Sequence, residues 1–173
     1  MRKQTMMLAV AVLVVLAALV AVRAQSQARP RGSLTALDYI EIQQLYGRYA
    51  IGYDTGNGGL WASAFTADGT FVLPGGKILS GRQQLTDFAA APGNNKGPTN
   101  VFHSNSNITI EPSRDGATGT SYVLLVNIGE SGKPSALTGG GIYRDEFVKT
   151  SEGWRIKKRV YQPAHSVPAT KTQ

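Results

Sequence analysis

Long strand-like segments separated by short turns fill the chain from residue 101 to residue 162, and they constrain the fold more than any other feature. The four segments are 101–110, 118–128, 140–149 and 154–162. Two of their connections are built on three-residue turns, at 114–116 and 151–153. A turn that short joins antiparallel neighbours, because a parallel crossover needs about a dozen residues or more. The segments therefore predict an antiparallel sheet.

Helical patterns precede this sheet. Thr35 followed by Asp38 resembles a capping box, and apolar and tyrosine side chains then recur at helical spacing until a glycine- and asparagine-rich cluster at 55–59. The predicted helices are 35–54, 60–65 and 81–91. Between the second and third, residues 70–79 resemble a hairpin or bent strand around a Pro-Gly-Gly turn. Helices followed by strands predict an α+β domain, with the helices packed on one face of a curved sheet.

The first 24 residues follow different rules from the rest. Arg2 and Lys3 precede an unbroken apolar run over 6–22, and small residues suit a cut after Ala24, which is the pattern of a secretory signal peptide. An uncleaved membrane anchor is the alternative, because the run lies at the lower limit of about 17–25 residues that spans a bilayer. Both alternatives predict a secreted or periplasmic location. The rest of the chain divides into a flexible spacer at 25–33, one domain at 34–162 and a loose tail at 163–173.

Composition argues against several classes of function. The chain has no cysteine, so thiolate metal ligands and disulfides are absent, and its two histidines, His103 and His165, form no ligand-spaced motif. Part of the net charge of +7 belongs to the signal segment. The basic residues at 149–159 alternate along a predicted strand and mix with acidic ones, which favours a solvated face over a nucleic-acid surface. We therefore expect no metal, no cofactor and no nucleic-acid partner.

Several stretches of the sequence resemble one family. They are Leu-Thr-Ala-Leu-Asp-Tyr-Ile-Glu-Ile-Gln-Gln-Leu-Tyr-Gly-Arg-Tyr at 34–49, Tyr-Asp-Thr-Gly at 53–56, Phe-Thr-Ala-Asp-Gly-Thr-Phe at 65–71, Gly-Ile-Tyr-Arg-Asp at 141–145 and Gly-Trp-Arg-Ile at 153–156. Over residues 34–162 this series resembles the SnoaL-like branch of the nuclear transport factor 2 (NTF2) superfamily. The resemblance implies an NTF2-like, cystatin-like cone, in which a curved antiparallel sheet carries about three N-terminal helices on its concave side. It also implies a homodimer paired through exposed sheet faces.

The resemblance leaves two classes of function open, because this superfamily holds enzymes and non-enzymes on one scaffold. Its enzymes include scytalone dehydratase, steroid isomerases and bile-acid dehydratases. They imply a cofactor-independent hydro-lyase or isomerase that acts on a small apolar or carbonyl-bearing ligand, polycyclic compounds included. The alternative is a non-catalytic domain of the same fold that binds a ligand or an assembly partner.

Asp54, His103 and Tyr49 are the candidate catalytic residues, and their spacing resembles that of the family's dehydratases. Asp54 ends the first predicted helix, where the helix C-terminus and an apolar cone disfavour the charged carboxylate and so make it a stronger base. The same position also suits an ordinary turn residue. His103 can exchange a proton near neutral pH or serve as a hydrogen-bonded structural residue. Tyr49 can donate its hydroxyl to an enolate oxygen, with Tyr46 or Tyr53 sharing that task, or can pack in the core.

The candidate substrate-binding residues are Tyr53, Asn127, Tyr143 and Arg144. Asn127 stands roughly where the family's dehydratases have a second acid/base residue. An amide does not transfer protons, so we expect Asn127 to orient a substrate or a water. Arg144 can clamp an acidic group of a ligand or remain a surface charge.

Alternation along the segment at 101–110 predicts its two faces. On the face of His103 we expect Val101, Asn105 and Asn107, and on the other face Phe102, Ser104 and Ile108.

Overall fold

A computed structural model of the chain describes residues 33–90, 100–129 and 134–164. The predicted signal peptide at 1–24 lies outside these residues, as do most of the spacer and most of the tail. The described residues from Leu34 onward group into one unit. Within the described ranges, none of the helices is both long enough and apolar enough to cross a membrane.

Helix α2 (Ala36–Asp54) begins where the sequence predicts. The Thr35 hydroxyl accepts the backbone N–H of Asp38, and the Asp38 carboxylate accepts the backbone N–H of Thr35, which completes the capping box. The buried side of α2 carries Ile42, Leu45, Tyr46 and Tyr49. They are four of the five positions of the helical stripe read from the sequence, and the fifth, Tyr53, is half-buried against the same core, so the prediction of an amphipathic helix is confirmed.

Two shorter helices, α3 (Gly58–Ala62) and α4 (Gly81–Ala90), pack beside α2. The Asn57 side chain caps α3 by accepting the backbone N–H of Leu60 at 2.9 Å. The prediction of a helix over 60–65 is therefore shifted. The Asn57 cap starts the helix earlier, and Phe65 already belongs to the sheet.

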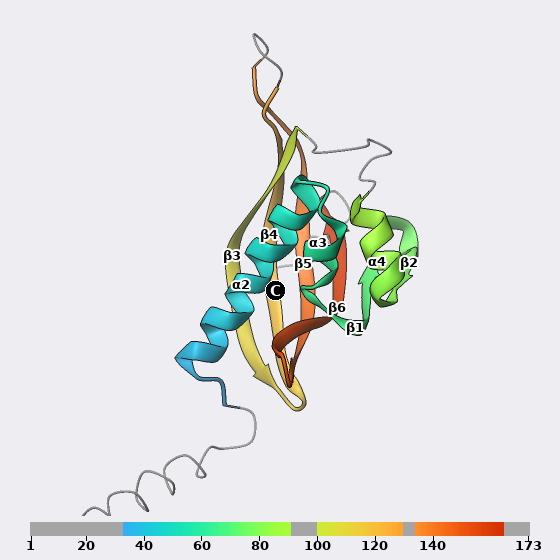
Figure 1. The fold of residues 1–173 in the computed structure, drawn as a ribbon. Helices are drawn as coiled ribbons and strands as arrows, with labels where there is room; N and C mark the ends of the chain where they lie inside the picture. The colour runs from blue at the N-terminus through green and yellow to red at the C-terminus, as the bar shows by residue number, and fades with distance from the viewer. Residues whose placement is uncertain (1–32, 91–99, 130–133, 165–173) are drawn as a thin grey trace, which may run out of the picture. The chain divides into compact units, whose positions relative to one another are not determined.

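The sheet has six strands in the order β2-β1-β6-β5-β4-β3 among the described residues, and Figure 1 shows α2 crossing one face of it. The strands are β1 (Phe65–Val72), β2 (Ile78–Ser80), β3 (Val101–Ser113), β4 (Gly116–Asn127), β5 (Ala136–Thr150) and β6 (Gly153–Pro163), and a 3₁₀ turn, η1 (Pro74–Gly76), joins β1 to β2. The described pairings are antiparallel, as predicted, except that β1 runs parallel to β6. The sheet is therefore mixed. Parallel pairing is possible here because α4 and strands β3 to β5 supply the long crossover that it needs.

A β-bulge in β3 changes which side chains face the helices. The register against β4 shifts between Ser106 and Thr109, and Asn107 adopts a positive φ of 51°. The extra residue reverses the alternation, so Asn107 is exposed while Ile108 and Ile110 pack against the core. The predicted faces before the bulge are correct, and the predicted positions of Asn107 and Ile108 are wrong.

A second bulge lies in β6. Its pairing with β5 shifts between Ile156 and Lys158, which leaves Lys157 as the extra residue. Ile156 and Arg159 consequently both face the core, and Arg159 is 0% exposed, opposite Asp145 of β5. The prediction of a solvated basic face over 149–159 is wrong at Arg159.

Asp38 ties the start of α2 to the sheet. Its Oδ1 accepts hydrogen bonds from Lys149 Nζ at 2.7 Å and from Trp154 Nε1 at 2.8 Å. Burial alone would raise the pKa of this carboxyl, but the hydrogen bonds from Lys149, Trp154 and Thr35 outweigh it and hold the pKa well below its ordinary value. Asp38 is therefore a structural anion that fixes the helix at one end of the sheet.

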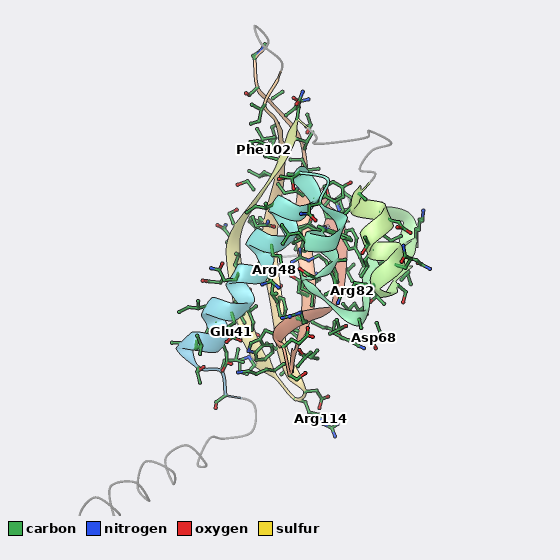
Figure 2. The ribbon with its side chains drawn as sticks, viewed as in Figure 1. Glu41, Arg48, Asp68, Arg82, Phe102 and Arg114 are labelled. Atoms are coloured by element: carbon green, nitrogen blue, oxygen red, sulfur yellow. The ribbon has the colours of Figure 1, made fainter. Side chains whose placement is uncertain are left out.

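The sheet face turned away from α2 carries an exposed apolar patch, which we call the outer patch. Its members Phe102, Tyr122, Leu124 and Leu137 are each at least 43% exposed. A groove of about 400 Å³ runs between Tyr122, Leu124 and the glycines at 139–141. Figure 2 shows Phe102 on β3, near the end of the sheet from which β4 and β5 extend. Apolar patches of this kind mark surfaces that bind a partner.

Candidate active site

The end of α2 and the start of β3 meet at one carboxylate. Asp54 is the last residue of α2 and is 9% exposed. Its Oδ1 lies 2.5 Å from Nδ1 of His103, and its Oδ2 accepts the backbone N–H of His103 at 2.9 Å. One carboxylate thus fixes both the ring and the backbone of the histidine, although the two residues are far apart in the sequence.

The second ring nitrogen of His103 remains open for chemistry. An ionised carboxylate only accepts hydrogen bonds, so Nδ1 of the neutral ring carries the proton and Nε2 is the acceptor. No described residue bonds Nε2, and the His103 ring lines a cavity. A carboxylate thus orients a histidine that can act as a base: Nε2 can take up a proton while Asp54 stabilises the resulting imidazolium.

Tyr49 and Tyr143 form a buried hydroxyl pair beside the histidine. The Tyr49 hydroxyl donates to the Tyr143 hydroxyl at 3.2 Å, and the Tyr49 ring lies edge-on to the His103 ring at 6.2 Å. Burial raises the pKa of Tyr49 to about 12 and raises the pKa of Tyr143 well above its ordinary value. Both phenols therefore stay protonated near neutral pH. Because Tyr49 donates to Tyr143, the Tyr143 proton is left for a ligand oxygen.

A buried ion pair lies behind these tyrosines. Arg159 donates from Nε and Nη2 to the Asp145 carboxylate at 2.7 and 2.8 Å, and neither side chain is exposed. The guanidinium carbon lies 4.2 Å from the ring centre of Tyr49 and 4.3 Å from that of Tyr143. Burial is the larger influence on the pKa of each tyrosine, and the Arg159 charge acts against it. The ion pair thus makes both phenols better hydrogen-bond donors than burial alone would.

A cavity of about 160 Å³ opens beside His103 and the tyrosine pair. Its lining also includes Phe71 of β1, Phe88 of α4, Leu125 of β4 and Tyr161 of β6. The larger groove on the outer patch is lined by no histidine or carboxylate among the described residues. The smaller cavity is therefore the candidate active site.

The structure brings five of the seven predicted site residues together. Asp54 holds His103, and Tyr49, Tyr53 and Tyr143 line the cavity with the histidine. The Tyr53 ring centre lies 5.0 Å from that of His103. Burial, and then the nearby Asp54 charge, raises the pKa of Tyr53, so its hydroxyl is also a proton donor rather than an anion.

Two predicted binding residues, Asn127 and Arg144, do not line the cavity. The Asn127 side chain turns back on its own strand end, where its Oδ1 accepts the backbone N–H of Gly129 at 2.8 Å. Arg144 follows the inward-facing Tyr143 in β5, so alternation places it on the outer face, where its Nε donates to Gln162 at 2.9 Å. Tyr46, the third candidate oxyanion donor, packs with its ring centre 4.9 Å from the guanidinium carbon of Arg159 instead.

Sequence reasoning missed the ion pair and several cavity walls. Arg159 belonged to the predicted solvated face at 149–159, because nothing in the sequence marks the bulge that turns Arg159 inward. The walls Phe71, Phe88 and Leu125 have patterns typical of ordinary core residues. As for metals, no three histidine or acidic side chains within 33–90, 100–129 and 134–164 gather closely enough to hold an ion.

Solved structures with similar architecture define the class of protein. A protein of unknown function with a cystatin-like fold from Nostoc punctiforme is 26% identical, with a TM-score of 0.68 over 79% of this chain and 98% of that one. Aln2 from a Streptomyces species is also 26% identical, with a TM-score of 0.66 over 76% and 94%. An NTF2-like protein with a cystatin-like fold from Novosphingobium aromaticivorans, 20% identical, has a TM-score of 0.65 over 88% and 92%. The fold is therefore the NTF2-like, cystatin-like cone that the sequence predicts.

The chain belongs to the SnoaL-like domain family, whose model matches residues 34–160. This confirms the resemblance read from the sequence. No functionally curated protein matches the sequence.

Proposed function

We propose that this SnoaL-like domain is a cofactor-independent dehydratase or double-bond isomerase acting on a small carbonyl compound. The contact of 2.5 Å between Asp54 and His103 at the wall of the cavity carries the proposal. It supplies a histidine whose free nitrogen is available to a ligand and whose other nitrogen is held by a carboxylate.

The proposed reaction begins when His103 Nε2 takes a proton from the carbon next to a carbonyl. The electron pair left behind forms an enolate, and Tyr143, supported by Tyr49, donates a hydrogen bond to the enolate oxygen. For isomerisation, the imidazolium returns the proton to another carbon of the conjugated system. For dehydration, the electron pair expels a hydroxyl on the neighbouring carbon, and the imidazolium proton leaves with it as water. Asp54 stabilises the imidazolium in both cases and positions the ring.

A non-catalytic ligand-binding domain of the same fold is the second candidate. The observation that favours it is the position of Asn127, whose side chain is bonded to Gly129 and supplies no second acid/base group to the cavity. In this alternative the Asp54–His103 contact joins α2 to β3 and moves no proton.

Hydrogen exchange separates the two candidates without knowledge of the natural substrate. A panel of cyclic ketones and enones is incubated with the protein in D₂O, and incorporation of deuterium at carbon is followed by NMR. We expect exchange well above the buffer rate with the wild type, and a loss of about a hundredfold or more in His103→Gln and in Asp54→Asn. Asp115→Asn in the β3–β4 turn is the matched control and is expected to match the wild type. Binding without exchange in the wild type would favour the non-catalytic domain.

We also propose that the domain is exported, with residues 1–24 acting as its signal peptide. The basic start, the apolar run over 6–22 and the small residue Ala24 support this proposal. Expression of the full chain followed by mass spectrometry of the mature protein is expected to give an N-terminus at Gln25. A cell-associated protein that retains its first residues would instead support the membrane anchor.

A further inference from the structure

We infer that the cavity accepts a neutral molecule with a single ring and one hydrogen-bonding oxygen, and that it excludes fused two-ring compounds. This inference rests on the proposed function, because it names the substrate class of the same site. It is narrower than the family resemblance, which admits polycyclic ligands.

The size of the cavity sets the number of rings. Its volume is about 160 Å³. A buried apolar cavity of about 150 Å³ in another protein holds one benzene molecule, so a single six-membered ring nearly fills the space available here. A fused second ring must either displace the walls or project from the mouth of the cavity.

The walls are backed by packed aromatic rings and cannot move freely. Phe88 lies 5.9 Å from Tyr53 and 5.8 Å from Trp61 between ring centres, and Trp61 is 0% exposed. The backbone of Trp61 also lies close to Gly52 of α2. A Cβ added at Gly52 would lie 2.5 Å from the backbone nitrogen of Trp61. Forcing extra atoms into such a packed site pushes side chains off their preferred rotamers, so a ligand that needs the extra space binds more weakly.

The charge of the lining sets the charge of the ligand. None of the described residues that line the cavity is an acid, a lysine or an arginine. The Asp54 carboxylate is already bonded to His103, and the Arg159 charge is paired with Asp145 behind the tyrosine rings. A cationic ligand would therefore be buried without a free anionic partner, and an anionic ligand would meet only the His103 ring, whose charge on protonation Asp54 already balances.

The polar groups of the lining indicate that the ligand carries one hydrogen-bonding oxygen. The Tyr143 hydroxyl can donate to a ligand oxygen, while Phe71, Phe88 and Leu125 offer only apolar contact to the rest of the molecule. A ring with one carbonyl or hydroxyl oxygen pairs with the Tyr143 hydroxyl and places its apolar carbons against the apolar walls.

Phenol, 2-naphthol and benzoate test the three parts of this inference. The protein is labelled with ¹⁵N-histidine, and ligand binding is followed through the ring signals of His103, assigned with the His103→Gln variant. Reading the titration at His103 excludes binding in the groove of the outer patch. We expect phenol to shift these signals saturably, and 2-naphthol and benzoate to bind at least about tenfold more weakly. Simple hydrophobic partition would give the opposite order for phenol and 2-naphthol, because the larger ring system buries more apolar surface.

Enlarged cavities provide the reciprocal test. Phe88→Ala removes a wall and is expected to increase 2-naphthol affinity by about tenfold or more, and Leu125→Ala serves the same purpose if the first variant does not fold. Leu124→Ala on the outer patch is the matched control and is expected to leave the order of affinities unchanged.

The outcomes separate this inference from the proposed function. If 2-naphthol or benzoate shifts His103 as readily as phenol in the wild type, or if phenol fails to bind, the inference is overturned. If phenol binds as expected but none of the cyclic ketones and enones incorporates deuterium at carbon, the ligand class stands and the catalytic proposal fails.

Discussion

Three buried aspartates have three different partners, and the partner determines what each carboxylate can do. Asp54 is bonded to His103, whose imidazole ring has both a donor and an acceptor nitrogen. Asp145 is bonded to Arg159, which stays charged at all physiological pH values. Asp38 receives bonds from a lysine and a tryptophan that fix a helix to the sheet. Only the first carboxylate has a partner suited to proton transfer.

Replacing Asp38 with asparagine should weaken the fold in a pH-dependent manner. The pKa of Asp38 is held below its ordinary value of 3.8, so its contribution to stability is present above that pH and is lost as the pH falls through the lower folded-state value. We expect Asp38→Asn to lower the free energy of unfolding by about 1–3 kcal/mol at pH 7, with the difference shrinking below about pH 4. Urea unfolding from pH 3 to 7 measures it. Asp115→Asn is the control, and an equal loss at every pH would contradict the electrostatic explanation.

Tyr49 should make the protein sensitive to alkali. Its pKa is about 12 in the folded chain, whereas a tyrosine in the unfolded chain titrates near 10. The folded state therefore keeps a proton that the unfolded state loses, and stability should fall as the pH rises from about 10 to 12. Unfolding of Tyr49→Phe should depend less steeply on pH in this window, as measured by tyrosinate absorbance and circular dichroism. Indistinguishable alkaline profiles would show that Tyr49 is not buried as described.

At the scale of elements, the sequence predicts what local rules determine and fails where a single extra residue intervenes. The capping box at Thr35 and the stripe of α2 follow from short-range preferences, and both are confirmed. The bulges at Asn107 and Lys157 have no such signature, because either register leaves some polar side chains on each face.

The candidate site also contains residues that the sequence predicts and residues that it does not. Residue types and the family resemblance single out Asp54 and His103, and the structure places them in contact. The inward position of Arg159 depends on the β6 bulge, so it could not be predicted from alternation alone. Parallel pairing of β1 with β6 was missed for a similar reason, since it depends on contacts between strands far apart in the chain.

The bulge in β6 can be tested through the ion pair that it buries. Arg159→Met leaves Asp145 charged and unpaired in the core, so we expect a loss of about 3–5 kcal/mol in the free energy of unfolding. The double variant with Asp145→Leu should recover most of that loss, because no buried charge remains. Arg144→Met, one strand position away from the inward Tyr143, is the control and should cost little. A small effect of Arg159→Met would place Arg159 on the outer face and rule out the bulge.

At the scale of the molecule, the two faces of the sheet carry different features. The face under α2 holds the cavity, and the other carries the outer patch of Phe102, Tyr122, Leu124 and Leu137. We propose that the outer patch pairs with a second copy of the chain, because a patch of apolar side chains on a sheet is self-complementary across a two-fold axis.

Leu124→Glu tests the homodimer. The variant places a charge in the middle of the outer patch, so we expect a dimeric wild type to become monomeric in sedimentation equilibrium. Phenol binding at His103 should survive, because the substitution lies on the opposite face of the sheet from the cavity. A wild type that is monomeric at all concentrations would contradict the pairing.

The cavity assigns chemistry and shape to different segments of the chain. Asp54 and His103, which we propose move the proton, lie where α2 meets β3, whereas Phe71, Phe88 and Leu125 only form walls. A substitution in a wall changes which molecule fits while the base and its carboxylate stay in place. The ligand preference of this scaffold can therefore change one side chain at a time, and every intermediate sequence retains the contact between Asp54 and His103.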